Sequence, residues 1–234
     1  MISIIIPAYN EEALLAATLQ AARSSADTTA EPYEIIVVDD GSTDRTAEIG
    51  RAHGARIVSV NLRQIGAARN AGAKVATGDL FVFVDADTIV SPEVLRGAIA
   101  AVRDGAVAGG AGARQDSNDP PWGPRAFAVA GWIMRTVGWA AGCFMFVRAD
   151  VFRRVGGFDE RYFASEEIHL SRAVKRHGRL VILRDTVITS GRKGRLFTAR
   201  QIVLQYAMAI VPGTLTRRDR LGMWYAGDRE KDGK

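Results

Sequence analysis

The sequence predicts an α/β protein with a mostly parallel central sheet and helices on both faces. Short apolar runs such as Leu80–Val84 are typical of strands that are buried on both faces. These runs alternate with segments of helical pattern, the order that produces parallel strands joined by right-handed crossovers. Two of the runs end in acidic pairs, at residues 39–40 and 85–87, and ligands bind at the carboxyl ends of strands in such sheets.

The elements of the first half follow in order. We expect strands at residues 3–7, 33–38, 55–60 and 80–84. We expect helices at residues 13–22, about 45–53, 65–76 and 91–103. Asn10 is placed to cap the first helix, Gly78 stops the third, and Pro92 suits the first turn of the fourth.

The second half is less regular. We expect strands at residues 106–115, 143–148, 180–183 and 186–189. We expect helices at residues 126–137, 150–155 and 166–177. A C-terminal helical extension follows, in which large apolar residues are mixed with clustered arginines.

Composition restricts the class of protein. With 234 residues, 47% of them hydrophobic and 24% charged, the chain can bury a globular core. The single cysteine, Cys143, excludes an internal disulfide and fits a reducing compartment. The N-terminus lacks the pattern of a signal peptide, and the most apolar stretch, residues 127–147, contains Arg135 and three glycines. We therefore expect no transmembrane helix and a cytoplasmic location, with peripheral contact at the inner face of the membrane left open.

The net charge is +5, and the excess of basic residues falls between Arg172 and Arg220. Such a region suits anionic partners, although a solvated basic surface explains it as well. No nucleic-acid-binding motif accompanies it, so we expect no nucleic-acid partner. The mixture of arginine and apolar residues after residue 194 suits either an amphipathic contact with an anionic membrane surface or a helix that covers the sheet or forms a homodimer.

Asp85 and Asp87 are the first candidates for a site. If the strand geometry continues past Val84, both carboxylates point to the same side, where they repel each other unless a cation or a proton lies between them. A hard divalent metal that carries a phosphorylated substrate suits such a pair. The alternative is structural: Asp85 caps the strand and Asp87 opens a turn before the next helix.

Separate stretches, in order along the chain, together resemble the family 2 nucleotide-sugar glycosyltransferases of the GT-A fold. They are SIIIPAYNEE at residues 3–12, VVDDGSTD at 37–44, GAARNAG at 66–72, DAD at 85–87 and GGFDE at 156–160. The resemblance implies a Rossmann-like catalytic domain at residues 1–194, followed by the extension at residues 195–234. It also implies transfer of a sugar from a nucleoside diphosphate sugar, UDP-linked by preference, to an acceptor hydroxyl.

The resemblance assigns the nucleotide side of the site. Asp39 would accept a hydrogen bond from the N3–H of uracil, and Pro7, Tyr9 and Glu11 would line the base pocket. Arg69 would offer its guanidinium to a phosphate or a carboxylate, or else form a structural salt bridge with Asp39 or Asp85. Asp40 is expected to be structural, as a cap of the following loop.

The metal and the proton acceptor follow from the same resemblance. Asp87 would bind Mn²⁺ or Mg²⁺, with Asp85 as a second ligand or as the partner of the ribose. The family commonly supplies the base from a Glu-Asp pair, whereas this chain has Glu166-Glu167, so we assign Glu167 as base and Glu166 as the residue that orients the site. Both could instead be first-turn acids that the helix dipole favours. His169 is a possible further metal ligand, with a structural role as the alternative.

Other functions are kept open. The departures at Glu167 and His169 also fit a catalytically silent nucleotide-sugar-binding or scaffold protein, or a retaining GT-A enzyme. A nucleotidyltransferase would need a glycine-rich basic loop after the first strand, which residues 7–11 do not offer. The acceptor is undetermined; a lipid-linked or cell-envelope hydroxyl fits the basic extension, and Trp122, Trp132 and Trp139 could contact it or simply pack in the core.

Overall fold

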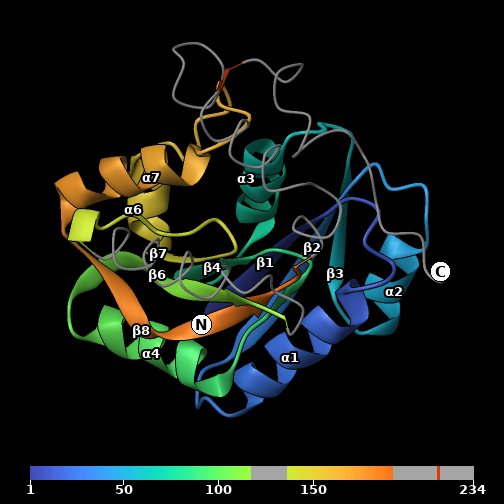
Figure 1. The fold of residues 1–234 in the computed structure, drawn as a ribbon, viewed down its shortest axis with the longest axis horizontal. Coiled ribbons are helices and arrows are strands. Elements are labelled where there is room, and N and C mark those ends of the chain that lie inside the picture. The colour runs from blue at the N-terminus through green and yellow to red at the C-terminus, as the bar shows by residue number, and fades with distance from the viewer. Residues whose placement is uncertain (117–135, 192–214, 217–234) are drawn as a thin grey trace.

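The computed structural model describes residues 1–116, 136–191 and 215–216, and these residues form one sheet with helices against both of its faces (Figure 1). The strands are β1 (Ile2–Ala8), β2 (Tyr33–Asp40), β3 (Arg56–Val60), β4 (Leu80–Val84), β5 (Thr88–Ile89), β6 (Ala106–Gln115), β7 (Phe144–Arg148) and β8 (Arg179–Thr189). The helices are α1 (Leu15–Asp27), α2 (Thr46–Ala52), α3 (Ile65–Val75), α4 (Pro92–Arg103), α6 (Ala149–Arg154), α7 (Glu166–Val174) and the short 3-10 helix η1 (Lys175–His177).

The sheet has the order β3-β2-β1-β4-β7-β6-β8-β5. The first four strands in this order are parallel, as the alternation of strands and helices predicts. β7 runs antiparallel to both of its neighbours, β6 and β8 are parallel, and the short β5 runs antiparallel to β8. The predicted α/β class, with a mostly parallel sheet between helices, is confirmed.

Each face of the sheet has its own apolar core. One core includes Leu15, Leu19, Val94 and Leu95 of α1 and α4, together with side chains of β1 and β4. The other joins the opposite side of the sheet to α3, α6 and α7. In Figure 1, α1 and α4 lie below the sheet and α3, α6 and α7 lie above it. The buried strands therefore read as continuous apolar runs, because both faces are covered.

The turn after β1 differs from the prediction. Asn10 has a left-handed backbone with φ 51° and does not cap a helix, since α1 begins only at Leu15. Its N–H donates to Ser42 Oγ at 3.0 Å, and its side-chain oxygen accepts from the N–H of Thr43 at 2.8 Å. The residue predicted as a helix cap thus binds the loop after β1 to the loop after β2.

Two further differences concern strands. The short strand β5 was not predicted, because two residues give no periodic signal. The two strands predicted at residues 180–183 and 186–189 are one strand, β8, whose register against β6 shifts between Leu183 and Thr186. Such an irregularity inserts extra residues into a single strand, which explains the apparent break in the sequence pattern.

Part of the second half lies outside the described residues, including most of the helix predicted at residues 126–137 and nearly all of the extension after residue 194. Within the described ranges, no helix combines the length and the apolar character needed to cross a bilayer. Of the extension, the structure describes Leu215 and Thr216, and the carbonyl of Leu215 accepts a hydrogen bond of 2.7 Å from the N–H of Phe163.

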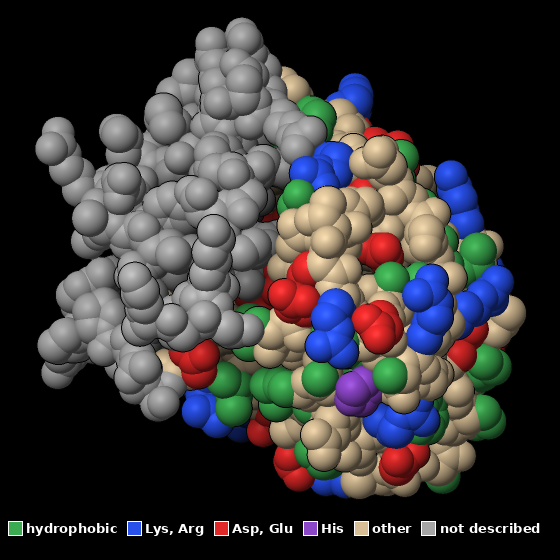
Figure 2. Space-filling model, turned by 90° about the vertical axis from the view of Figure 1, so that its right-hand side faces the viewer, with side chains coloured by type: hydrophobic (Ala, Val, Ile, Leu, Met, Phe, Trp, Pro, Cys, Tyr) green, Lys and Arg blue, Asp and Glu red, His purple; other side chains and the backbone are tan. Residues whose placement is uncertain are grey.

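Acidic and basic side chains are interspersed on the face that α2 and β3 present, the right-hand side of Figure 1 (Figure 2). The described part of that face shows no extended patch of a single sign, so it offers no simple electrostatic surface for a polyanion.

Candidate active site

Arg69 lies at the centre of the candidate site. It projects from α3 and its side chain is 2% exposed. Its Nη1 donates to Glu166 Oε1 at 2.7 Å, and its Nη2 donates to Asp85 Oδ1 and to the carbonyl of Gly142, both at 2.8 Å. Burial alone would lower the pKa of Arg69, but the surrounding carboxylates raise it above its ordinary value, so the guanidinium stays charged. Arg69 thus joins the end of β4 to the start of α7.

Arg69 forms a salt bridge with Asp85, which is one of the structural contacts expected from the sequence. Its second salt bridge, with Glu166, was not expected. Among the described residues, Arg69 Nε is a buried side-chain nitrogen without a hydrogen-bond partner. The guanidinium carbon lies 5.2 Å from the centroid of the Phe158 ring, whose π face partly compensates a buried cation.

Glu166 and Glu167 begin α7 directly after Ser165, whose backbone is left-handed with φ 61°. Glu166 is buried and ion-paired with Arg69; burial raises its pKa although Arg69 opposes the shift. Glu167 is half-buried, and burial, followed by repulsion from Glu166, raises its pKa to about 8. The two glutamates therefore differ: one is held in a salt bridge, and the other binds its proton more tightly than an ordinary glutamate.

Gly142 lies between Arg69 and Glu167. A Cβ built at this position would stand 3.5 Å from Arg69 Nη2 and 3.5 Å from Glu167 Cδ. The absence of a side chain leaves room for the guanidinium and for the glutamate carboxyl, which both lie next to this glycine. Glu167 therefore belongs to the same cluster as Arg69 and Asp85, although its carboxylate has no direct hydrogen bond to Arg69.

The strand ends at Val84. The prediction that the carboxylates of Asp85 and Asp87 point to the same side required the strand geometry to continue past this residue. The N–H of Asp85 donates to the carbonyl of Cys143 at 3.1 Å, and the N–H of Thr88 donates to the carbonyl of Asp85 at 3.0 Å, which closes a turn. Both carboxylates lie near enough to Cys143 to act on its thiol: burial, then Asp85 and Asp87, raise the pKa of Cys143 to about 12. Cys143 directly precedes β7 and does not form part of it.

These residues give the site an excess of negative charge. Asp85, Glu166 and Glu167 lie around a single guanidinium, and burial together with repulsion from Glu166 raises the pKa of Glu167. The described residues contain no group of three or more His, Cys, Asp or Glu side chains arranged to hold a metal. Two carboxylates, with the remaining positions filled by water and substrate phosphate, are the usual protein ligands of Mg²⁺, so the donor set fits a metal that arrives with a diphosphate.

The residues predicted for the nucleotide side lie where β1 and β2 end together. Ala8 pairs with Asp39, so Tyr9 emerges next to Asp39 and Asp40. Asp39 is buried, and its Oδ1 accepts from the N–H of Ser42 at 3.1 Å. Pro7 lies inside β1, opposite Val38, where the pairing of β1 with β4 has already ended. Glu11 is buried where its backbone N–H donates to Thr46 Oγ1 at 2.8 Å.

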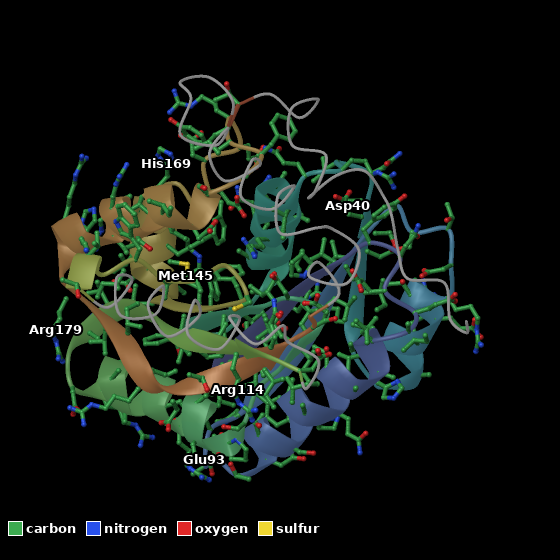
Figure 3. The ribbon with its side chains drawn as sticks, in the orientation of Figure 1. Asp40, Glu93, Arg114, Met145, His169 and Arg179 are labelled. Atoms are coloured by element: carbon green, nitrogen blue, oxygen red, sulfur yellow. The ribbon has the colours of Figure 1, made fainter. Side chains whose placement is uncertain are left out.

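Asp40 is structural, as expected, but it stabilises a different loop. Its carboxylate accepts hydrogen bonds from the backbone N–H groups of Leu62, Arg63 and Gln64, at 2.6, 2.8 and 3.0 Å. These three residues lead into α3, so Asp40 fixes the entry to the helix that carries Arg69. In Figure 3, Asp40 lies to one side of α3 and His169 lies to the other, on α7.

Two further residues that hold the site together were not assigned a role from the sequence. Asn70 donates to the carbonyl of Phe158 and accepts from its N–H, each at 2.9 Å. Gln64 Nε2 donates to the carbonyls of Glu160 and Tyr162. Asn70 belongs to the GAARNAG motif and Phe158 to the GGFDE motif, so the presence of both motifs could have indicated that the two residues interact. Gln64 lies outside these motifs, and nothing in the sequence indicates its role.

His169 is not gathered with Asp85 and Asp87, because the described residues contain no group of three such side chains. Its ring is stacked on that of Tyr162, with centroids 3.7 Å apart. Burial, then Arg172, lowers its pKa, while Asp159 opposes the shift. The stacking contact fits the structural alternative for His169.

The aromatic residues considered for the acceptor side are only partly described. Trp139 lies under the guanidinium of Arg172, with 5.1 Å between the guanidinium carbon and the ring. Trp122 and Trp132 fall outside the described residues.

Comparison with known proteins gives a consistent result. The family model of glycosyl transferase family 2 matches residues 3–156. The chain is 38% identical over 145 residues to an undecaprenyl-phosphate 4-deoxy-4-formamido-L-arabinose transferase of Edwardsiella ictaluri, a match that covers 58% of this chain and 44% of the relative. It is 35% identical over 108 residues to a validoxylamine A glucosyltransferase of Streptomyces hygroscopicus subsp. limoneus, covering 43% of this chain and 23% of the relative. The chain thus spans less than half the length of either curated relative.

The fold is shared with solved glycosyltransferases. A mannosyltransferase from Pyrobaculum calidifontis, in complex with GDP-Man and Mn²⁺, superimposes with a TM-score of 0.72 at 22% sequence identity. The match covers 88% of this chain and 61% of the mannosyltransferase. A glucosyl-3-phosphoglycerate synthase from Mycobacterium tuberculosis, in complex with Mn²⁺, uridine diphosphate and glucosyl-3-phosphoglycerate, gives a TM-score of 0.61 at 20% sequence identity. This match covers 89% of this chain and 79% of the synthase. At this level of identity the likeness establishes the predicted GT-A fold.

Proposed function

Because the chain belongs to glycosyl transferase family 2, we propose that it transfers a sugar from a nucleoside diphosphate sugar to an acceptor hydroxyl. The observation that carries the proposal is the cluster at the end of β4, in which Asp85, Glu166 and Glu167 surround the buried Arg69. This cluster adjoins the ends of β1 and β2, where a nucleotide would bind in a sheet of this kind. Phosphate, sugar and acceptor would thus meet between β4 and α7.

The nucleotide would bind at the ends of β1 and β2. The buried carboxylate of Asp39 uses one oxygen for the N–H of Ser42, which fixes its orientation and leaves capacity to accept the N–H of a base. Tyr9 and Glu11, both on the turn after β1, and Pro7 within that strand would form the rest of the base pocket. UDP is the favoured nucleotide, since uracil presents the N3–H that Asp39 would accept.

Asp87, with Asp85, would hold a divalent cation, Mn²⁺ or Mg²⁺. When bound, such a cation offsets the charge that develops on the departing nucleoside diphosphate. Solved structures of the same fold hold Mn²⁺ together with GDP-Man or with uridine diphosphate, which supports a metal of this type. Arg69, itself held by Glu166, would keep the carboxylate of Asp85 in place for this role.

Glu167 would act as the general base that takes the proton from the acceptor hydroxyl, with inversion at the sugar. Its partner Glu166 is committed to Arg69, so Glu167 is the glutamate that can exchange a proton. A base works best when its pKa lies near the operating pH, and the raised value places Glu167 closer to that range than an ordinary glutamate. The glutamate in place of the family's aspartate therefore suits the role.

We propose that the acceptor hydroxyl belongs to a lipid-linked molecule, reached from the membrane surface. The support is the Edwardsiella relative, which is named as an undecaprenyl-phosphate sugar transferase, together with the basic composition of residues 195–234.

The test compares metal-dependent nucleotide binding in two variants. Asp87→Ala should abolish the Mn²⁺-dependent part of UDP binding, measured by calorimetry with and without Mn²⁺. Asp79→Ala is a matched control, because Asp79 directly precedes β4 and its side chain is 94% exposed. Unchanged Mn²⁺-dependent binding in Asp87→Ala would show that the metal assignment is wrong.

A catalytically silent binding protein is the competing function, and the substitution at Glu167 is the feature that favours it. UDP-sugars should be hydrolysed slowly by the wild-type chain in the presence of Mn²⁺, with the activity lost in Glu167→Gln. If UDP binds normally but no UDP-, GDP- or dTDP-sugar is turned over, the silent protein becomes the better description.

A further inference from the structure

Arg63 has an unusual backbone conformation next to the candidate nucleotide site. It lies in the loop between β3 and α3 with φ 53°, in the left-handed region that disfavours a residue with a Cβ and suits glycine. Asp40 holds this conformation by accepting the N–H of Arg63 at 2.8 Å. A strained residue that its surroundings fix in place is a reason to look for a function.

The side chain of Arg63 lies over the turn after β1. Its guanidinium carbon is 3.6 Å from the centroid of the Tyr9 ring, and its Nη1 donates to the carbonyl of Gly41 at 3.3 Å. Tyr9 follows β1 and Gly41 follows β2, and these strands end side by side where Ala8 pairs with Asp39. The guanidinium therefore spans both loops that flank Asp39, from a position that is half-buried.

This arrangement combines two kinds of recognition. The guanidinium and the Tyr9 ring are both flat groups of the kind that stack on a nucleobase. A guanidinium carries five N–H donors, of which the contact with Gly41 uses one, while the carboxylate of Asp39, two residues before Gly41, is an acceptor. A donor next to an acceptor matches a base edge in which a carbonyl adjoins a ring N–H.

Building on the proposed function, we propose that Arg63 is a nucleobase-recognition residue, which stacks with Tyr9 and donates to the base carbonyl beside the N–H that Asp39 accepts. Uracil and guanine have such an edge, with a ring N–H next to a carbonyl. Cytosine and adenine have an unprotonated ring nitrogen at that position and would leave Asp39 without its donor. The chain should therefore bind UDP and GDP more tightly than CDP and ADP.

The experiment measures UDP and CDP binding by calorimetry in the presence of Mn²⁺, for the wild-type chain and for Arg63→Gly and Arg63→Ala. Both variants lack the guanidinium, so both should weaken UDP binding about tenfold, and should weaken CDP binding, which loses only the stacking contribution, by a smaller factor. Glycine relieves the left-handed backbone and alanine does not, so Arg63→Gly should melt about 2–4 °C above Arg63→Ala. Arg96→Ala is the control, because Arg96 is an exposed arginine on α4.

The outcomes separate the two proposals. UDP affinity within twofold of wild type in both Arg63 variants overturns the role of Arg63 while leaving the proposed function in place. Tighter UDP binding in both variants also overturns it, since Arg63 would then block the face of Tyr9. If the wild-type chain binds neither UDP nor GDP with Mn²⁺, the proposed function fails, and this inference fails with it.

Discussion

Replacing Glu167 by glutamine tests the chemistry and the electrostatics of the site together. Glutamine has nearly the same shape but cannot accept a proton from an acceptor hydroxyl, so turnover should fall about 10²–10⁴-fold. The same change removes a carboxylate that lies among Glu166 and Asp85, which repel it. We therefore expect the variant to be less active and, at alkaline pH, more stable.

The size of the gain follows from the pKa. Burial and Glu166 raise the pKa of Glu167 from 4.5 to about 8. In the unfolded chain, Glu167 loses its proton near the ordinary pKa of 4.5. Between pH 4.5 and about pH 8 the folded state therefore binds more protons than the unfolded state, and stability falls as pH rises. At about 1.4 kcal/mol per pKa unit the upper bound is roughly 5 kcal/mol, which solvent at a half-buried side chain reduces to about 1–3 kcal/mol.

The assay is chemical denaturation of the wild-type chain and Glu167→Gln from pH 5 to pH 9, without metal. The difference in the free energy of unfolding should be near zero at about pH 5 and reach its full value above about pH 8. Glu48→Gln is the matched control, because Glu48 is an exposed glutamate on α2 and should show no such trend. In parallel, kcat/KM of the wild type with Mn²⁺ should rise with pH and level off below about pH 8, since a bound cation lowers the pKa of the base.

Two results would refute this reasoning. A stability difference that does not grow between pH 5 and pH 9 would show that Glu167 has an ordinary pKa in the folded protein. Full turnover in Glu167→Gln, together with loss of turnover in Glu166→Gln, would show that the other glutamate is the base.

Two further predictions concern the support of the site, and a third concerns the membrane. Arg69→Met should destabilise the fold by about 3–5 kcal/mol in thermal or denaturant unfolding, because Asp85 and Glu166 would lose their buried partner; a loss below 1 kcal/mol would contradict the importance of the ion pairs. Gly72→Ala should cost about 1–3 kcal/mol in the same assay, since a Cβ there would stand 2.5 Å from a side chain of β1, and wild-type stability would show that α3 can move away. Deleting residues 195–234 should abolish flotation with vesicles that contain anionic lipid, and equal partitioning of both chains would end the membrane proposal.

The sequence predicts the first half of the fold well because its elements are regular. The helix at residues 65–76 and the strand at residues 80–84 each lie within one residue of the observed bounds, since burial on both faces produces clear apolar runs. The predictions failed where long-range contacts decide the local structure. Asn10 has the residue type of a helix cap, but hydrogen bonds to Ser42 and Thr43 place it in a left-handed turn.

The site was predicted as a set of residues rather than as a geometry. The motifs placed Arg69, Asp85 and Glu166 in one family pattern, but no spacing indicates that one guanidinium bridges both carboxylates across 97 residues of chain. The different environments of Glu166 and Glu167 could not be read from two adjacent identical letters either. They arise because successive residues of a helix point in directions about 100° apart, so that only one of them meets Arg69.

The hydrogen bonds from α3 to the segment before α7 have a consequence for how this protein could change its substrate. Gln64 reaches main-chain carbonyls, and Asn70 holds both backbone groups of Phe158, so the path of that segment depends little on its outward side chains. Tyr162 is stacked on His169 of α7, so its exchange would be felt by the helix that carries Glu167. Asp159 and Arg161 pair with each other at the surface instead, and their side chains take no part in the hydrogen bonds to Gln64 and Asn70. A library that varies these two positions would therefore change the outward charge of the segment while its attachment to Gln64 and Asn70 stays in place.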